Sequence, residues 1–330
     1  MKEAVTIKEI GRQLGISPST VSRALQDNPR IGLKTREAVR ELAEKLQYVP
    51  SIAARNLRQG RTGVIAVVLP EIRENFFSEV VNGIEEVAFT NQSTVALYQS
   101  HDRYDREKQI LETLASNQVD GVLLSVANES AQFGHVQRLL DRGIPVVLLD
   151  RIPPNIDTHQ VECDMEKGAY EATKWLADRG CQRIALLNGP QPLVASEERY
   201  RGYVKALIES QLPVENALIK RVDLTTADTR EKMTQLLATA HPDAVLAFND
   251  YVALDAMQTC RSQSNTVISF VSFANLPLTT YLEHPPLASV EQHPYKMGFT
   301  AATILLRLIG GTLAATDLQK IVFAPELVVR

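Results

Sequence analysis

The sequence predicts a small all-α head, a short connecting segment and an α/β core of two doubly wound parallel-sheet lobes. Three observations predict this architecture. Capped helix patterns fill residues 6–46, the net charge changes sign near residue 61, and from residue 63 onwards apolar strand patterns alternate with helix patterns. A chain of 330 residues is long enough for two or three domains with substantial cores.

Residues 6–25 have the pattern of two short helices joined by a tight turn. Thr6 and Glu9 form a predicted capping box, in which each side chain binds the other's backbone N–H. Ser17 is the expected N-cap of the second helix, and Pro18 takes its first position. Such helix–turn–helix units place a helix in the DNA major groove, although capped pairs also occur in ordinary bundles. The side chains expected to face outwards from the second helix are Ser19, Ser22 and Arg23.

A third helix is expected over residues 33–46, and the whole head is basic. Residues 1–61 hold 12 Lys and Arg against 6 Asp and Glu, a net charge of +6. The full chain holds 35 against 39, which leaves 23 against 33, or −10, for residues 62–330. A basic head suits the phosphate backbone of DNA, and an acidic body opposes loose association with it. The alternative is a solvated helical bundle with a scattered charge excess.

Composition indicates a soluble globular protein, with 45% hydrophobic and 22% charged residues. No apolar run reaches the length of a membrane span, and the N-terminal residues lack the apolar core of a signal peptide. We therefore expect a cytoplasmic protein. The three cysteines, Cys163, Cys181 and Cys260, have neither disulfide nor metal-ligand spacing, and the six histidines are scattered. No metal and no cofactor are expected.

Strand and helix patterns alternate along the core in two series. Continuous β-branched and apolar runs predict buried strands over 63–69, 94–98, 121–126, 145–149, 183–187, 218–222, 244–248 and 267–271. Helix patterns fall between them, and a further helix is expected from residue 294 to about residue 309. Two such series predict two lobes with a cleft between them.

Ligands of doubly wound folds bind beyond the carboxyl ends of the strands. The residues placed there by the strand pattern are Phe76, Phe77, Asp150, Asn188, Asn249, Asp250, Ala274 and Asn275. Aromatic rings with a carboxylate and amides suit a small polyhydroxylated ligand. The chain carries no dinucleotide, P-loop, nucleophile-elbow or H-E-x-x-H motif, so an enzyme is not expected.

Several motifs in order resemble the LacI/GalR family of bacterial transcription regulators. They are Ser17–Leu25 with Lys34–Arg36, Tyr48-x-Pro50 with Ala54-x-x-Leu57, Asn75–Phe77 with Gly83–Glu85, Val119–Val122, Gly189-Pro190 with Arg199-x-x-Gly202-Tyr203, Phe248–Asp250, Ser289–Gln292 and Glu326–Arg330. The resemblance covers nearly the whole chain. It implies a helix-turn-helix head over 1–50, a hinge helix and linker over 51–61, and a periplasmic-binding-protein-like core over 62–330. The first lobe would take about 62–160 plus 293–318, and the second about 161–292 plus 319–330.

The resemblance also implies a homodimer that binds a near-palindromic DNA operator. The head residues that would contact DNA are Ser17, Pro18, Ser19, Thr20, Ser22, Arg23, Gln26 and Lys34. Pro18, Ser19 and Arg23 would face bases, and Arg23 has the two donors that match guanine O6 and N7. Gln26 stands where the family often has Asn.

In the connecting segment, the residues that would contact DNA are Ser51, Ala54, Arg55 and Leu57. Leu57 would be the wedge that unstacks a central base step and kinks the duplex. A segment this short is not stable as an isolated helix, so its folding would depend on DNA and on the partner chain. The alternative is a plain linker with Leu57 packed on the core.

For the small-molecule effector, the resemblance selects Phe76, Phe77, Asp150, Asp164, Arg199, Asn249 and Ala274. Sugar-binding members usually carry Asp where this chain has Ala274, and Leu193 and Ala195 add little polarity to the second lobe. A sugar remains the first expectation, with an oligosaccharide fragment, a modified sugar or a non-sugar metabolite as alternatives.

The sequence thus predicts an effector-controlled DNA-binding regulator, and the family favours a repressor. The competing hypothesis is a solute-binding protein of a transport system with the same two-lobed body. The basic head and the N-terminal residues argue against it. Because no heptad segment follows the core, we expect a dimer rather than a tetramer.

Overall fold

The computed structural model describes residues 5–48, 61–73, 75–117, 119–130, 132–153, 155–263 and 267–330. The chain forms two compact units, residues 1–60 and 61–330, and each is described here by itself. The predicted hinge residues Ser51, Ala54, Arg55 and Leu57 lie outside the described residues.

The head is a three-helix unit made of α1 (Ile7–Leu14), α2 (Pro18–Leu25) and α3 (Leu33–Lys45). Its small core is centred on Ile10, Val21, Ala24 and Val39, which are fully buried. Gly15 ends α1 with a φ of 66°, a left-handed conformation that favours glycine.

Only one of the two hydrogen bonds of the predicted capping box forms at the start of α1. The Thr6 hydroxyl accepts a hydrogen bond from the Glu9 backbone N–H at 3.4 Å. The Glu9 carboxylate, however, binds Arg12 at 2.7 Å and Gln13 at 2.8 Å instead of returning to Thr6. The predicted reciprocal box is therefore wrong in its second half, because a charge-assisted pair one turn along the helix competes for the carboxylate.

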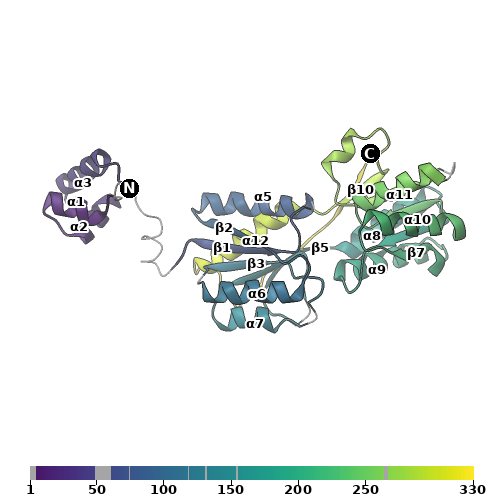
Figure 1. Ribbon diagram of the computed structural model, residues 1–330, viewed down its shortest axis with the longest axis horizontal. Coiled ribbons are helices and arrows are strands. Elements are labelled where there is room, and N and C mark those ends of the chain that lie inside the picture. Colours follow the sequence, from purple (N-terminus) through teal and green to yellow (C-terminus); the bar gives the residue numbers. More distant parts are fainter. Residues whose placement is uncertain are drawn as a thin grey trace. The chain divides into compact units, whose positions relative to one another are not determined.

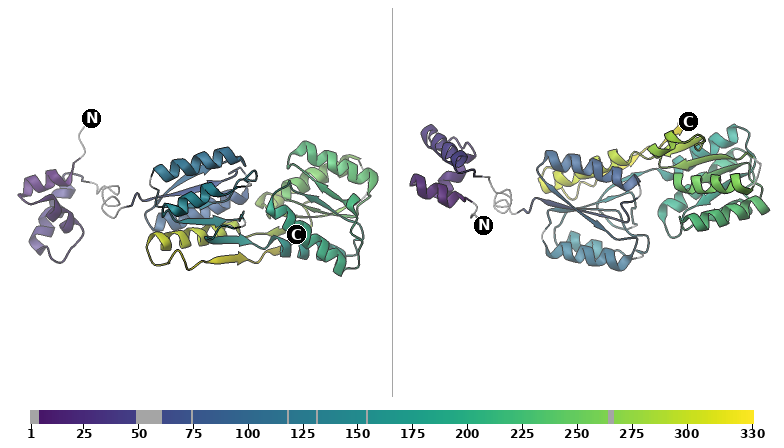
Figure 2. Two further views of the ribbon diagram at one scale, coloured as in Figure 1. Left: turned by 90° about the horizontal axis from the view of Figure 1, so that it is seen from below. Right: turned by 45° about the horizontal axis from the view of Figure 1, so that its top comes forward.

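The core contains two six-stranded sheets with helices on both faces of each (Figure 1, Figure 2). The order of the first sheet is β11-β5-β4-β3-β1-β2, and all of its strand pairs are parallel. Its strands are β1 (Val64–Leu69), β2 (Thr94–Gln99), β3 (Gly121–Leu124), β4 (Val146–Leu149), β5 (His159–Cys163) and β11 (Lys320–Phe323).

The second sheet has the order β12-β10-β9-β8-β6-β7. Its strands are β6 (Ile184–Asn188), β7 (Ile219–Arg221), β8 (Ala244–Ala247), β9 (Ser269–Phe273), β10 (Ala288–Glu291) and β12 (Glu326–Val329). Strand β12 runs antiparallel to β10, with Ala288 opposite Val329. The expectation of a purely parallel second lobe is corrected at this edge.

Helices cover each sheet in pairs. The first sheet packs against α5 (Asn75–Thr90) and α12 (Pro294–Ile309) on one face and α6 (Tyr104–Ser116) and α7 (Gly134–Asp141) on the other. The second packs against α8 (Met165–Asp178) and α9 (Val194–Glu209) on one face and α10 (Thr226–Thr239) and α11 (Asp250–Gln263) on the other. Short 3₁₀ helices occupy Asn216–Leu218 and Pro277–Tyr281.

Two helix pairs approach each other closely because glycines face the partner backbone. A Cβ on Gly298 of α12 would lie 2.0 Å from the Val80 carbonyl oxygen of α5, and one on Gly83 of α5 would lie 2.1 Å from the Tyr295 oxygen. Gly202 of α9 would bring a Cβ to 2.0 Å from the Glu166 oxygen of α8.

The lobes exchange strands near the end of the chain. Strand β11 pairs with β5 in the first sheet, while β12 lies in the second. The crossing therefore falls at residues 324–325 rather than at 318–319. Strand β5 lies wholly in the first sheet. The first lobe therefore continues to Cys163, past its expected boundary at residue 160. Among the described residues, no helix is both long and apolar enough to cross a membrane.

Candidate functional site

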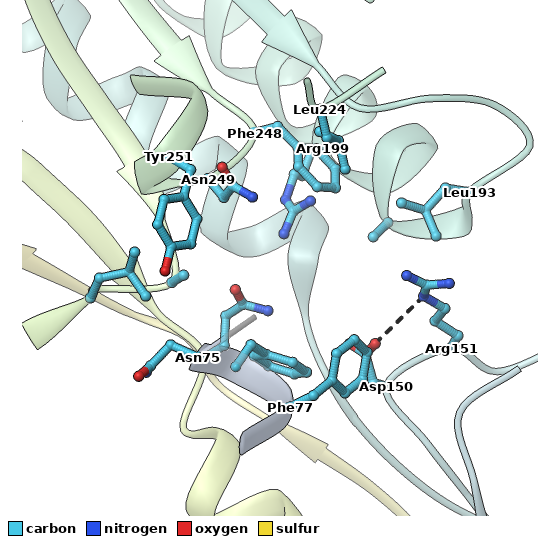
Figure 3. Close-up of a pocket in the computed structure, with 15 residues that line it drawn as sticks. Asn75, Phe77, Asp150, Arg151, Leu193, Arg199, Leu224, Phe248, Asn249 and Tyr251 are labelled. Carbon is cyan, nitrogen blue, oxygen red and sulfur yellow. Dashed lines mark ion pairs between the residues drawn. The ribbon is translucent and has the colours of Figure 1, made fainter. Parts of the chain in front are cut away.

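A cleft at the carboxyl ends of the strands is lined by both lobes of the core (Figure 3). About 640 Å³ of space, open solvent included, lies between its walls. The first lobe contributes Asn75, Phe76, Phe77, Asp150 and Arg151. The second contributes Leu193, Ala195, Arg199, Leu224, Phe248, Asn249, Tyr251, Ala274 and Leu276, and Gln292 follows β10.

The two phenylalanines begin α5, directly below the cleft. Their rings meet edge to face, with centroids 5.1 Å apart and planes at 83°. Phe77 is 2% exposed and belongs to the hydrophobic core, while Phe76 is half-buried and available to a ligand. Both rings line the cleft, and Phe77 also belongs to the core.

Asp150 follows β4 with a φ of 63°, and its neighbour Arg151 turns back beside it. The Arg151 Nε lies 3.9 Å from Asp150 Oδ2, and the same guanidinium binds Asp102 and lies 5.9 Å from the centre of the Phe77 ring. Burial raises the pKa of Asp150, although Arg151 and Arg199 both favour its charged form. The sequence analysis selected Asp150 but not Arg151 as a lining residue.

Arg199 projects from α9 and is 5% exposed. Its guanidinium lies between two aromatic rings, 4.0 Å from the Phe248 centroid and 4.2 Å from that of Phe273. The rings hold the planar group in one orientation through cation–π contacts. Figure 3 shows the guanidinium directed toward the space above Phe77.

One end of the Asn249 side-chain amide, its oxygen, is used within the second lobe. Its Oδ1 accepts the Val252 backbone N–H at 2.9 Å at the start of α11. Its amide nitrogen lies on the cavity side in Figure 3. Ala274 also lines the cleft, with a φ of 90° that is unusual for a residue with a side chain.

Three other strand-end residues serve the fold and do not line this cleft. Asp250 is fully buried and accepts hydrogen bonds from the Ser272 and Ser289 hydroxyls and from the Leu276 N–H. Asn188 and Asn275 likewise bind neighbouring loop or strand groups.

Asp164 is not brought to the cleft. Its carboxylate accepts the Lys167 N–H at 2.8 Å as the N-cap of α8, and it lines a separate hollow with Glu166 and Tyr170. A carboxylate one residue before a helix meets the free N–H groups of the first turn, and this local bond determines its direction.

The exposed side of α2 in the head carries Pro18, Ser19 and Arg23. Ser17 caps the helix by accepting the Thr20 N–H at 3.2 Å. Lys34, at the start of α3, and Gln26 are exposed as well. Within residues 5–48, Arg23 and Lys34 form no ion pair, whereas Asp27 pairs with Arg36 and Arg40.

Ser22 is the exception on this helix. It was expected to face outwards, but it is only 7% exposed. Ser22 lies between the buried residues Val21 and Ala24 on α2. Its small side chain is therefore at the edge of the helix face that packs in the head.

Sequence reasoning did not select seven of the lining residues, namely Asn75, Arg151, Leu224, Phe248, Tyr251, Leu276 and Gln292. Tyr251 follows β8 closely and was within reach of the strand-end rule. Leu224, three residues beyond the end of β7, was within reach of the same rule.

Comparison with known proteins gives consistent matches along the chain. Residues 62–322 match the family model for periplasmic binding proteins and the sugar binding domain of the LacI family. Residues 6–51 match the model for bacterial regulatory proteins of the lacI family.

Curated relatives match over nearly their whole length. Catabolite control protein A of Priestia megaterium is 31% identical, with 92% of each chain covered. The ribose operon repressor of Halalkalibacterium halodurans is 32% identical, with 92% of this chain and 90% of that protein covered. The transcriptional repressor PurR of Vibrio parahaemolyticus is 31% identical, with 98% and 97% covered.

Among solved structures, the transcriptional regulator CelR in complex with cellobiose is 28% identical, with a TM-score of 0.74 and 99% of both chains covered. The lac repressor dimer bound to operator is 23% identical with a TM-score of 0.85, which shows a shared fold. The chain belongs to the LacI family of bacterial regulatory proteins.

Proposed function

We propose that this protein is a DNA-binding transcriptional repressor whose affinity for its operator is controlled by a small molecule bound in the cleft of the core. The observation that carries the proposal is the combination of an exposed, capped recognition helix bearing Arg23 with a cleft to which both lobes contribute polar side chains. It acts as a homodimer on a near-palindromic operator in the cytoplasm, and it regulates rather than catalyses.

In the head, Pro18, Ser19 and Arg23 face the bases, and Ser17, Thr20, Gln26 and Lys34 contact the backbone or flanking positions. The exposure of Arg23 and its lack of an ion pair within residues 5–48 support this role. Ser22 stays a proposed phosphate contact, with only 7% of its surface exposed. Ser51, Ala54, Arg55 and Leu57 remain the proposed minor-groove contacts.

In the core, the effector lies between Phe76 and Phe77 on one side and Arg199 and Asn249 on the other, with Asp150 binding a hydroxyl. The relatives include a ribose operon repressor and a regulator solved with cellobiose, which supports a carbohydrate or a carbohydrate derivative. A ligand that binds the open and closed arrangements of the lobes unequally changes the population of the DNA-binding form.

The test is operator binding measured against salt. An operator is first selected from a random duplex library with the full-length protein. Each phosphate contact should contribute about −0.9 to the slope of log affinity against log salt concentration. Replacement of Arg23 by Ala should weaken binding by roughly 1–3 kcal/mol, or about 5- to 150-fold, and relax specificity at one base pair.

Arg12→Ala is the matched control, since Arg12 is an exposed arginine of the same head that pairs with Glu9 on α1. Its affinity should change little. A flat salt profile, or no sequence selected above the library background, contradicts the repressor and favours the solute-binding alternative.

A further inference from the structure

The chain passes between the two lobes of the core at three places, which we call the crossings. The first crossing is Asp164 between β5 and α8, the second is residues 292–293 between β10 and α12, and the third is residues 324–325 between β11 and β12. The Asp164 backbone N–H donates to the Phe323 carbonyl oxygen at 3.0 Å, so the first and third crossings are joined. A change in the arrangement of the lobes must bend these segments, since they connect the two sheets.

A short loop after β9 reaches the cleft through Ala274 and Leu276. Two backbone N–H groups anchor this loop in the second lobe. The Asn275 N–H donates to Ser289 Oγ at 2.9 Å, and the Leu276 N–H donates to Asp250 Oδ2 at 2.6 Å. Neither bond uses the Asn275 side chain, so the loop keeps both anchors when that side chain is changed.

The Asn275 side chain joins this loop to the second crossing. Its Nδ2 donates to Glu291 Oε2 at 3.0 Å, and Glu291 Oε1 accepts the His293 backbone N–H at 2.6 Å. Its Oδ1 accepts a hydrogen bond from Arg330 Nη2 at 3.0 Å, directly after β12. His293 has a φ of 57°, a strained conformation that persists only where the surroundings hold it. One amide therefore connects the cleft loop to a crossing and to the strand that follows another.

A second contact links the cleft to the same crossing through a sulfur atom. Gln292 lines the cleft, and its Nε2 lies 3.6 Å from the Sδ of Met165, which begins α8 directly after the first crossing. Arg199 Nη2 lies 3.6 Å from the same sulfur. A thioether is a weak acceptor, whereas a carboxylate is a strong one. The bond between Asn275 and Glu291 is therefore the stronger of the two polar links.

From these contacts we infer that Asn275 is a positioning residue that couples the cleft to the arrangement of the two lobes. A ligand that moves the loop moves the Asn275 amide, which displaces Glu291 and, through it, the backbone of the second crossing. Asn275 thereby changes the population of the DNA-binding form without contacting the effector or the operator. The inference rests on the proposed function, since it assigns a residue to the control of operator binding.

The test reverses the polarity of the hydrogen bond between Asn275 and Glu291. Asn275→Asp keeps an acceptor for Arg330 and tolerates the left-handed backbone, but it places one carboxylate against another. Glu291→Gln keeps an acceptor for the His293 N–H but presents an amide NH₂ group to the NH₂ group of Asn275. The double variant restores the bond with donor and acceptor exchanged, and it has the wild-type net charge.

Backbone hydrogen exchange reports on the second crossing directly. It is measured by mass spectrometry on the full-length protein without ligand. Amides of residues 289–293 should exchange at least about tenfold faster in each single variant, since a hydrogen bond to a carboxylate is lost, and should return to the wild-type rate in the double variant. Residues 244–247 of β8 should exchange alike in all four proteins, which separates a local change from global unfolding.

Operator affinity is measured on the same four proteins, with an operator selected as described above. Each single variant should change the Kd by at least about fivefold, and the double variant should return to within about twofold of the wild type. Glu291 also lies opposite Glu326 of β12, so its variant removes a like-charge pair as well, and the coupling is taken from the whole cycle. Asn216→Asp and Glu231→Gln make the same replacements at exposed positions of the second lobe and should change neither measurement.

The proposal is overturned if the effects of the two substitutions simply add in the double variant, or if the single variants match the wild type. Faster exchange with unchanged operator affinity makes Asn275 a structural residue alone and also overturns it. A wild-type protein that selects no operator rejects the proposed function and this inference with it. A wild-type protein that binds its operator while every variant binds equally well rejects the inference and leaves the repressor standing.

Discussion

Replacement of Gly298 by Ala tests the closest helix contact in the first lobe. The new Cβ would lie 2.0 Å from the Val80 oxygen, 2.8 Å from its carbonyl carbon and 3.1 Å from its Cα. All three atoms belong to the backbone of α5, which cannot rotate away as a side chain could. Since ordinary contact begins near 3.4 Å, α5 and α12 must separate by roughly 1.4 Å.

Two effects of opposite sign set the magnitude. Ala is favoured over Gly in a helix interior by about 1 kcal/mol. Overpacking of a well-packed core costs about 1–3 kcal/mol and sometimes more, and a backbone clash belongs at the upper end of that range. We expect a net loss of about 2 kcal/mol in the free energy of unfolding, which lowers the melting temperature by roughly 4–8 °C.

The assay is urea and thermal unfolding followed by circular dichroism. Gly134→Ala is the matched control, because Gly134 begins α7 and a Cβ there would meet nothing within 4 Å. It should leave stability unchanged or raise it by up to about 1 kcal/mol. A Gly298→Ala protein as stable as this control would refute the close approach of α5 and α12.

Two further predictions concern the buried hydroxyl of Tyr203 and the half-buried carboxyl of Glu198. Tyr203→Phe removes a hydroxyl that donates to the Ile184 carbonyl oxygen at 2.8 Å inside the second lobe. The free energy of unfolding measured in urea should therefore fall by about 1–2 kcal/mol. An unchanged midpoint would mean that this hydrogen bond contributes nothing to stability. Burial, with Glu162 nearby, raises the pKa of Glu198 from 4.5 to about 7. The folded state thus binds this proton more tightly than the unfolded state, and stability falls as the pH rises from about 4.5 through about 7. Glu198→Gln should therefore stabilise the protein at pH 8 more than at pH 4, and an equal effect at both would contradict the raised pKa.

Much of the fold could be predicted because its signals are local. Apolar periodicity located all eight strands that the sequence analysis named, with small shifts at their ends. Four strands had no such signal, namely β5, β10, β11 and β12. The last two are four residues long and only partly buried, so their partners rather than their own pattern make them strands.

The site divides in the same way. Strand-end logic selected Asp150 and Asn249, because the carboxyl ends of parallel strands share one edge of a sheet. It also selected Asp250, whose carboxylate lies inside the second lobe among two serine hydroxyls. The end of a strand fixes where a residue lies along the chain but not whether its side chain turns to ligand or to core.

The sequence by itself determined the Thr6 and Ser17 caps, the alternation of strands and helices and the basic head, because each depends on residues within a few positions of one another or on composition. The tertiary structure decided which of the candidate residues turn toward the cleft. Leu224 reaches it from a loop, Asp164 is held away by its helix, and Ser22 is enclosed by the head. Those outcomes depend on sheet order and helix packing, which bring together groups far apart in the chain and are not recorded in any short stretch of it.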